Sequence, residues 1–145
     1  MAVSVLFLGT QNAVRSQMAE ALLRKHGGDQ FEVYSAGLEA GDIHPLTIQV
    51  PQEIGIDTSS LHVTLLKNIM GQRKYAHGLI VCRRAEAACP TIADAHHIHR
   101  WIFDNPADVQ GTDEEKLAKF RETRDHIEAR IVLWLQETTE EEVRR

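Results

Sequence analysis

Cysteine, proline and aromatic residues are scarce in this chain, and long apolar runs are missing. The 145 residues include 2 Cys and 4 Pro, and 6% of them are aromatic. Two cysteines are too few for a disulfide framework and favour free thiols or a transient redox pair. No stretch reaches the roughly 18 consecutive apolar residues of a membrane span, and the N-terminus lacks the basic flank and apolar run of a secretory signal. We therefore expect a cytoplasmic protein that does not enter a membrane.

Basic residues are also in deficit. The chain has 16 Lys and Arg against 21 Asp and Glu, which gives a net charge of −5. This balance provides no positive field for a polyanion, so nucleic-acid binding is not expected. The length suits one domain with a single sizeable core, and no linker or repeat divides it. We assign the domain to residues 1–138 and predict that residues 139–145 form an acidic, frayed tail. The oligomeric state stays open.

Apolar runs that alternate with helical patterns indicate βαβ units. Strands are predicted at Val3–Leu8, Phe31–Ser35, Gly78–Val81 and His97–Trp101. Helices are predicted over Ser16–His26, from Pro45 onward, and from the capping box Thr112–Glu115 through Leu135. Pro51 should kink or shorten the second of these helices, because it frees a carbonyl of the preceding turn. The sequence therefore predicts a single α/β domain with a four-stranded, mostly parallel sheet flanked by helices.

A short polar loop joins the first predicted strand to the first predicted helix. Backbone N–H groups of such a loop, the positive end of the following helix and the Arg15 guanidinium can surround a tetrahedral dianion such as phosphate, sulfate or arsenate. Asn12 tolerates the left-handed conformation of a tightly curled loop, while Ser16 can either cap the helix or donate its hydroxyl into the pocket. The candidate oxyanion-binding residues are Gly9, Thr10, Gln11, Asn12, Ala13, Val14, Arg15 and Ser16. The alternative is an ordinary strand-to-helix turn with an exposed arginine.

The segment Leu6–Ala21 resembles the oxyanion loop of low-molecular-weight protein tyrosine phosphatases and thioredoxin-linked arsenate reductases, which reads Cys-x5-Arg-Ser. Further matches follow in that family's order: Tyr34-Ser35-Ala36-Gly37, His44-Pro45, Glu53–Asp57, Val81-Cys82, Cys89-Pro90, Trp101–Ala107 and Phe120–Ile127. The resemblance covers nearly the whole chain and implies the low-molecular-weight phosphatase (phosphotyrosine phosphatase I) fold. Two cysteines seven positions apart favour the arsenate-reductase branch.

The resemblance also shows what the loop lacks. Gly9 stands where the family carries its nucleophilic cysteine, and Asn105 stands where the phosphatases carry the aspartic acid that protonates the leaving oxygen. Glycine cannot attack phosphorus or arsenic, and an amide cannot deliver a proton. Asp104 is the one substitute acid nearby, but in an extended segment its side chain points to the opposite side from Asn105. The chain as given is therefore expected to be inactive.

Cys82 and Cys89 occupy the places of the resolving thiols that, in the reductases, relay a disulfide to thioredoxin. Arg83 and Arg84 would favour the Cys82 thiolate. On an intact helix the two cysteines would lie ~10 Å apart along the axis, farther than a disulfide permits, so oxidation must unwind Arg83–Ala88. The alternative is that both cysteines are small core residues.

Metal ions and organic cofactors are not expected. In the segment His96-His97-x-His99, adjacent histidines of a strand point to opposite faces, and no Cys or carboxylate pair nearby completes a tetrahedral site. The resemblance offers weak potassium candidates in Asn12, Glu20 and Ser35. The fourth position, where a carboxylate is expected, is occupied by Thr64.

The favoured function is binding of an oxyanion or phospho-ligand by a pseudoenzyme without turnover, with thioredoxin as a partner through the two cysteines. One alternative is an active arsenate reductase or tyrosine phosphatase, which uses Cys82 as nucleophile or whose natural sequence carries cysteine at position 9. Another is a protein-interaction module that uses the old pocket as a docking surface. The sequence does not identify the physiological ligand.

Overall fold

The protein forms a four-stranded parallel sheet in a computed structural model that describes residues 2–39, 41–88 and 92–144. The strands are β1 (Val3–Gly9), β2 (Phe31–Gly37), β3 (Tyr75–Ile80) and β4 (Ala95–Arg100). They lie in the order β2-β1-β3-β4, and every neighbouring pair is parallel. The predicted α/β class with a four-stranded parallel sheet is confirmed.

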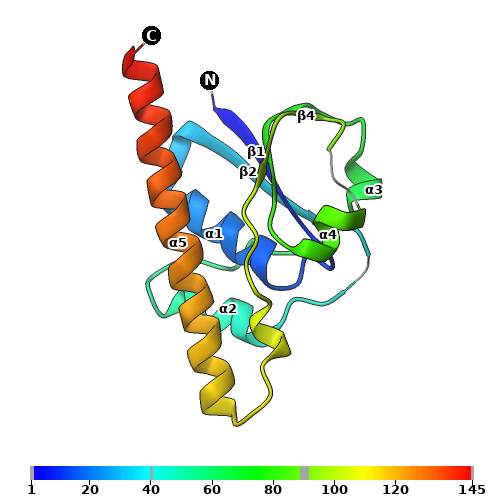
Figure 1. The fold of residues 1–145 in the computed structure, drawn as a ribbon, viewed down its shortest axis with the longest axis vertical. Coiled ribbons are helices and arrows are strands. Elements are labelled where there is room, and N and C mark those ends of the chain that lie inside the picture. Colours follow the sequence, from blue (N-terminus) through cyan, green and yellow to red (C-terminus); the bar gives the residue numbers. More distant parts are fainter. Residues whose placement is uncertain (1, 40, 89–91, 145) are drawn as a thin grey trace.

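Helices cover both faces of the sheet. They are α1 (Arg15–Gly27), α2 (Pro45–Gln52), α3 (Leu66–Ile69), α4 (Arg83–Ala88) and α5 (Asp113–Arg144), with single 3-10 turns η1 (Gly28–Gln30) and η2 (Pro106–Asp108). In Figure 1 the long helix α5 runs beside α1 on one side of the molecule, and α3 and α4 lie on the other. The segment from residue 139, expected as a frayed tail, continues the backbone of α5 to Arg144.

Several helix ends follow from local chemistry. The α2 helix has only eight residues and contains Pro51 in its last turn, which confirms the predicted shortening. The capping box before α5 is formed, since the Glu115 N–H donates to Thr112 Oγ1 at 3.1 Å and the Thr112 N–H donates to Glu115 Oε1 at 3.4 Å. After α1 the chain turns at Gly28, whose φ of 55° suits a glycine.

The central strand β1 separates two hydrophobic cores. Val5 and Phe7 point into the core beneath α1 and α5, whereas Leu6 and Leu8 point into the core beneath α3 and α4. All four side chains are fully buried, as expected for a central strand of a parallel sheet that is covered on both faces. This packing fixes the carboxyl end of β1, where the candidate loop begins.

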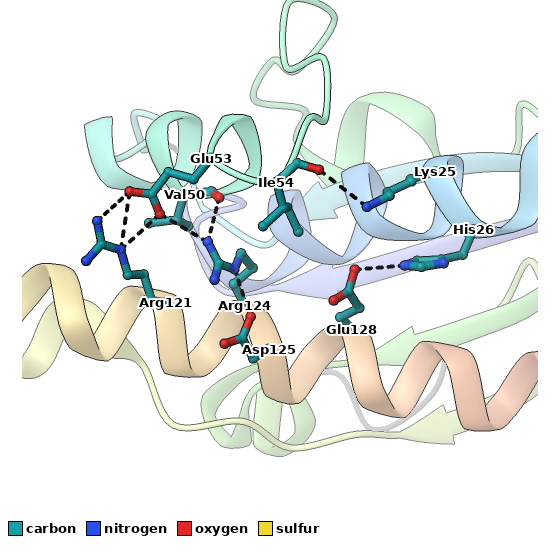
Figure 2. Close-up of polar contacts among 9 residues, drawn as sticks. All are labelled: Lys25, His26, Val50, Glu53, Ile54, Arg121, Arg124, Asp125 and Glu128. Atoms are coloured by element: carbon teal, nitrogen blue, oxygen red, sulfur yellow. Dashed lines mark hydrogen bonds and ion pairs between the residues drawn. The ribbon is translucent and has the colours of Figure 1, made fainter.

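Polar contacts fasten α5 to the helices beside it (Figure 2). Arg124 is 8% exposed, and its Nη1 donates to the Val50 carbonyl at 2.9 Å and to Glu53 Oε1 at 3.0 Å. The half-exposed Arg121 binds the same carboxylate with Nη2 at 2.6 Å from Oε2. His26 of α1 lies 2.8 Å from Glu128. Arg124 makes the most buried of these contacts, and it binds the Val50 carbonyl as well as the Glu53 carboxylate.

Arg124→Met is expected to lower the free energy of unfolding by about 1–3 kcal/mol, because it strips a buried carbonyl and a carboxylate of their donor while the Met side chain keeps the packing of the stem. Arg121→Met is the matched control and should cost less, because its ion pair is exposed to solvent. Urea unfolding of both variants measures the difference. Equal losses would show that burial of Arg124 adds nothing.

Candidate functional site

A cavity of about 730 Å³ opens at the carboxyl ends of β1 and β3 and beside the segment that follows β4. Its lining comes from residues 9–16, 42–45, 82–84 and parts of 103–108. The strand order changes direction between β1 and β3, and ligands of open α/β sheets bind at such a switch point. All eight predicted oxyanion-binding residues, from Gly9 to Ser16, are among the lining residues.

The loop carbonyls are held by the surrounding chain. The Thr10 carbonyl accepts the N–H groups of Leu38 at 2.8 Å and Glu39 at 3.0 Å. The Ala13 carbonyl accepts the Thr47 hydroxyl at 3.0 Å and the His44 N–H at 3.2 Å. A loop whose carbonyls turn toward the scaffold presents its amide side to the cavity, which is the polarity that suits an anion.

Asn12 shapes the curl of the loop. Its φ is 56°, so the predicted left-handed conformation is confirmed. The buried side-chain amide donates to Ser16 Oγ at 2.8 Å and Ser35 Oγ at 2.9 Å, and its oxygen accepts the Thr64 N–H at 2.9 Å. The loop also rests directly on Gly37, where a Cβ atom would lie 2.7 Å from the Asn12 nitrogen. These contacts fix the loop before any ligand arrives.

Ser16 does not cap the helix, contrary to one of the two roles predicted for it. Helix α1 begins at Arg15, and its N-cap, Val14, makes no side-chain capping bond. Ser16 therefore lies inside the first turn, and its hydroxyl oxygen instead accepts from the Asn12 side chain. The helix starts one residue before the predicted Ser16.

Arg15 projects from the first turn of α1 toward the segment after β4. Its Nη1 donates to the Phe103 carbonyl at 2.9 Å. Burial lowers the pKa of the guanidinium, while the nearby charges of Cys82, Asp108 and Asp104 oppose that shift. The guanidinium stays charged in any case, since an arginine side chain keeps its proton in proteins. A fixed cation thus lies at the wall of the cavity.

Gly9 ends β1 at the floor of the loop. A Cβ atom at this position would lie 3.1 Å from Ser16 Oγ, 3.4 Å from Ser16 Cβ and 3.9 Å from Val81 Cγ2. Its φ is outside the left-handed region that only glycine tolerates well. A small side chain therefore fits at Gly9 after a shift of a few tenths of an ångström by the Ser16 hydroxyl.

Cys82 meets the loop from the next strand. It follows β3, lines the cavity, and its Sγ lies 3.0 Å from Thr10 Oγ1 and 3.4 Å from the Ala85 nitrogen. The residue is only 1% exposed and packs in the core beneath α4. The helix predicted between the two cysteines is confirmed as α4, Arg83–Ala88. Cys89 lies outside the described residues.

Asp104 and Asn105 both belong to the cavity wall, so the one substitute acid lies in the same wall as the amide. The two residues follow β4 in irregular backbone, where side chains do not alternate as they do in a strand. Asn105 Oδ1 accepts the Ala107 N–H at 3.1 Å and caps the turn η2, from which Asp108 also reaches the cavity.

The three weak potassium candidates lie together beside the loop. Ser35 Oγ bridges them, because it accepts from Asn12 and donates to Glu20 Oε1 at 2.7 Å. Burial raises the pKa of Glu20, and the Arg24 guanidinium 3.0 Å from its carboxylate supplies a cation at that point. Over residues 2–39, 41–88 and 92–144, no group of three or more His, Cys, Asp and Glu is arranged to hold a metal ion.

Sequence reasoning missed three members of the cavity wall. Asp42 and His44 belong to the segment before α2 and Asp108 belongs to η2, and of these polar residues only His44 carried any signal, as part of a family match. The His44 ring accepts the Leu46 N–H at its Nδ1 at 3.1 Å and caps α2. Burial and the charge of Lys116 lower the pKa of His44, so this ring is neutral at pH 7.

Comparisons with known proteins agree with this architecture. The family model described as low molecular weight phosphotyrosine protein phosphatase matches residues 4–144. The arsenate reductase of Halalkalibacterium halodurans is 42% identical over 130 residues, which cover 88% of this chain and 91% of the relative. The arsenate reductase of Bacillus subtilis is 37% identical over 128 residues, with the same coverage of 88% and 91%.

Solved structures extend the similarity to the fold. A structure described as an arsenate reductase in the reduced state has a TM-score of 0.75 and 26% identity, and the match covers 94% of this chain and 98% of that one. The chain therefore belongs to the low molecular weight phosphotyrosine protein phosphatase family, and the relatives named above fall in its arsenate-reductase branch.

In the described part of the chain, no helix is both long and apolar enough to cross a membrane.

Proposed function

We propose that this protein binds a tetrahedral oxyanion, either free or as part of a phospho-ligand, in the cavity at Gly9–Ser16 and does not turn it over. One observation carries the proposal: the surrounding chain binds the Thr10 and Ala13 carbonyls of the loop, which leaves its amide side for a ligand. The Arg15 guanidinium, anchored through Nη1 to the Phe103 carbonyl, lies in the wall of the same cavity. The arsenate reductases to which the chain is similar act on an oxyanion of this shape, which supports the same ligand class here.

Charge at the floor of the loop also favours binding. Where the family carries a nucleophilic thiolate, a negative charge lies beneath the bound anion and repels it. Glycine at position 9 removes that charge and opens space. The loop of this chain should therefore hold a dianion at least as tightly as the loop of an active relative.

Arg15→Ala is expected to weaken sulfate or phosphate binding about tenfold to 100-fold, the range for losing charge-assisted hydrogen bonds. Isothermal titration calorimetry at constant ionic strength measures the change. Arg73→Ala is the control, because it removes an arginine that stacks on Tyr34 and does not line the cavity. Unchanged affinity in Arg15→Ala would overturn the proposed site.

A second candidate, reduction of arsenate through Cys82, is favoured by the 3.0 Å contact between Cys82 Sγ and Thr10 in the cavity wall. The Cys82 thiolate would displace one arsenate oxygen as water and form an S–As bond. The Cys89 thiolate would then attack the Cys82 sulfur, and the electron pair of the S–As bond would reduce arsenic(V) to arsenic(III). The resulting disulfide would be left for thioredoxin to reduce. The burial of Cys82 favours binding alone, and arsenate turnover that is lost in Cys82→Ser would favour this second candidate.

Mild oxidation tests the cysteine pair separately. Peroxide is expected to form an intramolecular Cys82–Cys89 disulfide that thioredoxin reverses. The bond should require α4 to unwind, because a helix that ran through both positions would hold them farther apart than a disulfide permits. Mass spectrometry detects the bond, and hydrogen exchange should show lower protection across Arg83–Ala88. If both thiols stay free, or protection is unchanged, Cys82 is a packing residue only.

A further inference from the structure

A cluster of histidines lies away from the cavity, on the face of the sheet that α5 covers. His77 of β3 is paired in register with His97 of β4, and His99 follows two positions later on the same face. His77 Nδ1 and His99 Nε2 are 3.0 Å apart. The rings of His77 and His97 are stacked, with centroids 5.3 Å apart and an angle of 25° between them. Two imidazole nitrogens at this distance share one proton.

Helix α5 covers this pair with aromatic and cationic side chains. Trp134 is 5% exposed, and its ring stands edge-on to His77 at 5.0 Å and to His99 at 5.9 Å. Arg130 lies over the ring of Trp101, with its guanidinium carbon 4.6 Å from the centroid. The groups whose charges act on the pair are His96 and His97 on β4 and Arg130 on α5. Each of these is a cation or becomes one on protonation.

The hydrogen bond between the two rings depends on their protonation. When both imidazoles are neutral, one nitrogen donates its N–H and the other accepts. A proton added to the far nitrogen of the donor ring leaves this bond in place. Once both rings are cationic, two N–H groups face each other at 3.0 Å. Each added proton also places a positive charge near Arg130, at a partly buried position beneath Trp134. Protonation of both rings must therefore separate them.

We infer that the His77–His99 hydrogen bond is an acid-sensitive link between strands β3 and β4 beneath helix α5, formed while at most one of the two rings is charged and broken when both are protonated. The inference is independent of oxyanion binding, because none of its residues lines the cavity.

The direction of the pH effect follows from the histidine pKa values. Burial, together with the charges of the neighbouring histidines, lowers the pKa of His77 from 6.5 to about 4. Burial, His97 and Arg130 lower the pKa of His99. Between pH 6.5 and about 4 the unfolded chain thus binds more protons than the folded one, and the stability contributed by the pair is lost as the pH falls through this window.

The end of β4 should open when the His77–His99 hydrogen bond breaks. Beyond the strand, the Trp101 N–H donates to the Ile80 carbonyl at 2.9 Å, and the Phe103 N–H donates to the Val81 carbonyl at 3.2 Å. Because β4 is an edge strand, its backbone pairs with β3 on one side, and the side chains of α5 pack on the face that carries His99. We expect amide-exchange protection over residues 95–103 to fall below pH 5 and to remain unchanged in α1.

Nitrogen-15 NMR of the histidine rings in the unmodified protein is the direct test. At pH 6.5 one of the two facing nitrogens should be protonated and the other bare, and both rings should titrate below the pH of an exposed histidine. Arg130→Gln removes the fixed cation and should raise the pKa of His99. Ordinary titration of both rings near pH 6.5, or no change in Arg130→Gln, would overturn the inference.

His99→Gln gives a second readout, because an amide can turn to donate to a neutral ring or accept from a protonated one. Between pH 6.5 and 4.5 the unmodified protein should lose at least about 3 °C more in melting temperature than this variant does. His126→Gln, at an exposed histidine of α5, is the matched control and should behave like the unmodified protein. Equal losses of melting temperature in all three proteins would contradict an acid-sensitive His77–His99 link. If His99→Gln does not fold, the NMR titration decides.

Discussion

Gly9→Cys is expected to turn a catalytically silent protein into one that hydrolyses p-nitrophenyl phosphate. The unmodified chain should show no turnover above background with this substrate, nor with arsenate when thioredoxin and its reductase are supplied. Tighter binding cannot replace a covalent nucleophile, because binding substrate and transition state equally does not lower the chemical barrier. The gain should be roughly 10⁴-fold or more, since loss of the nucleophile costs other covalent enzymes at least that much.

The structure allows this substitution. The added Cβ meets Ser16 Oγ at 3.1 Å and otherwise makes ordinary contacts, and the sulfur would enter the cavity above the loop amides. Those amides, the first turn of α1 and Arg15 favour the thiolate form. Gly9→Ala is the matched control, because it adds the same Cβ without a thiol and should remain silent.

Two outcomes would contradict this assignment. Robust turnover by the unmodified chain that disappears in Cys82→Ser would make Cys82 the nucleophile. A folded Gly9→Cys protein that binds sulfate normally but forms no phosphoenzyme would show that position 9 no longer serves as a nucleophile site in this chain. Trapping the phosphocysteine by mass spectrometry distinguishes the second case from slow hydrolysis of the intermediate.

The parts of this fold that were predictable from sequence depend on local chemistry. The left-handed Asn12, the shortened helix at Pro51 and the capping box before α5 each follow from the conformational limits of one or two residues. The loop boundaries also follow from a strand pattern that meets a helix pattern. Such features need no knowledge of what packs against them.

The contacts that define the cavity were not predictable in this way. Ser16 accepts from Asn12 instead of capping, Cys82 meets Thr10 across 72 positions, and Arg15 binds a carbonyl 88 positions away. Each depends on how the ends of β1, β3 and β4 come together, which no local pattern encodes. Asp104 shows the same limit, since a period-2 rule applies within a strand and β4 ends at Arg100.

Asn105→Asp is expected to raise turnover by a further 10²–10⁴-fold when it is combined with Gly9→Cys, the usual range for a general acid. Asn105 lies in the cavity wall, and its Oδ1 caps η2 by accepting the Ala107 N–H at 3.1 Å. Aspartate keeps an oxygen at that position and caps equally well, so the fold should be preserved. The added group differs mainly in its ability to deliver a proton to the leaving oxygen.

The choice of leaving group makes this last prediction specific. Phenolate leaves less readily than p-nitrophenolate, so the gain from Asn105→Asp should be larger with phenyl phosphate than with p-nitrophenyl phosphate. The rate should also become pH-dependent and fall as the pH rises and the new carboxyl loses its proton. Asn105→Asp with Gly9 retained is the control and should stay silent, because an acid without a nucleophile has no leaving group to protonate. If Asp104→Asn abolishes the activity of Gly9→Cys and Asn105→Asp adds nothing, then Asp104, which shares the cavity wall, is the acid of this site.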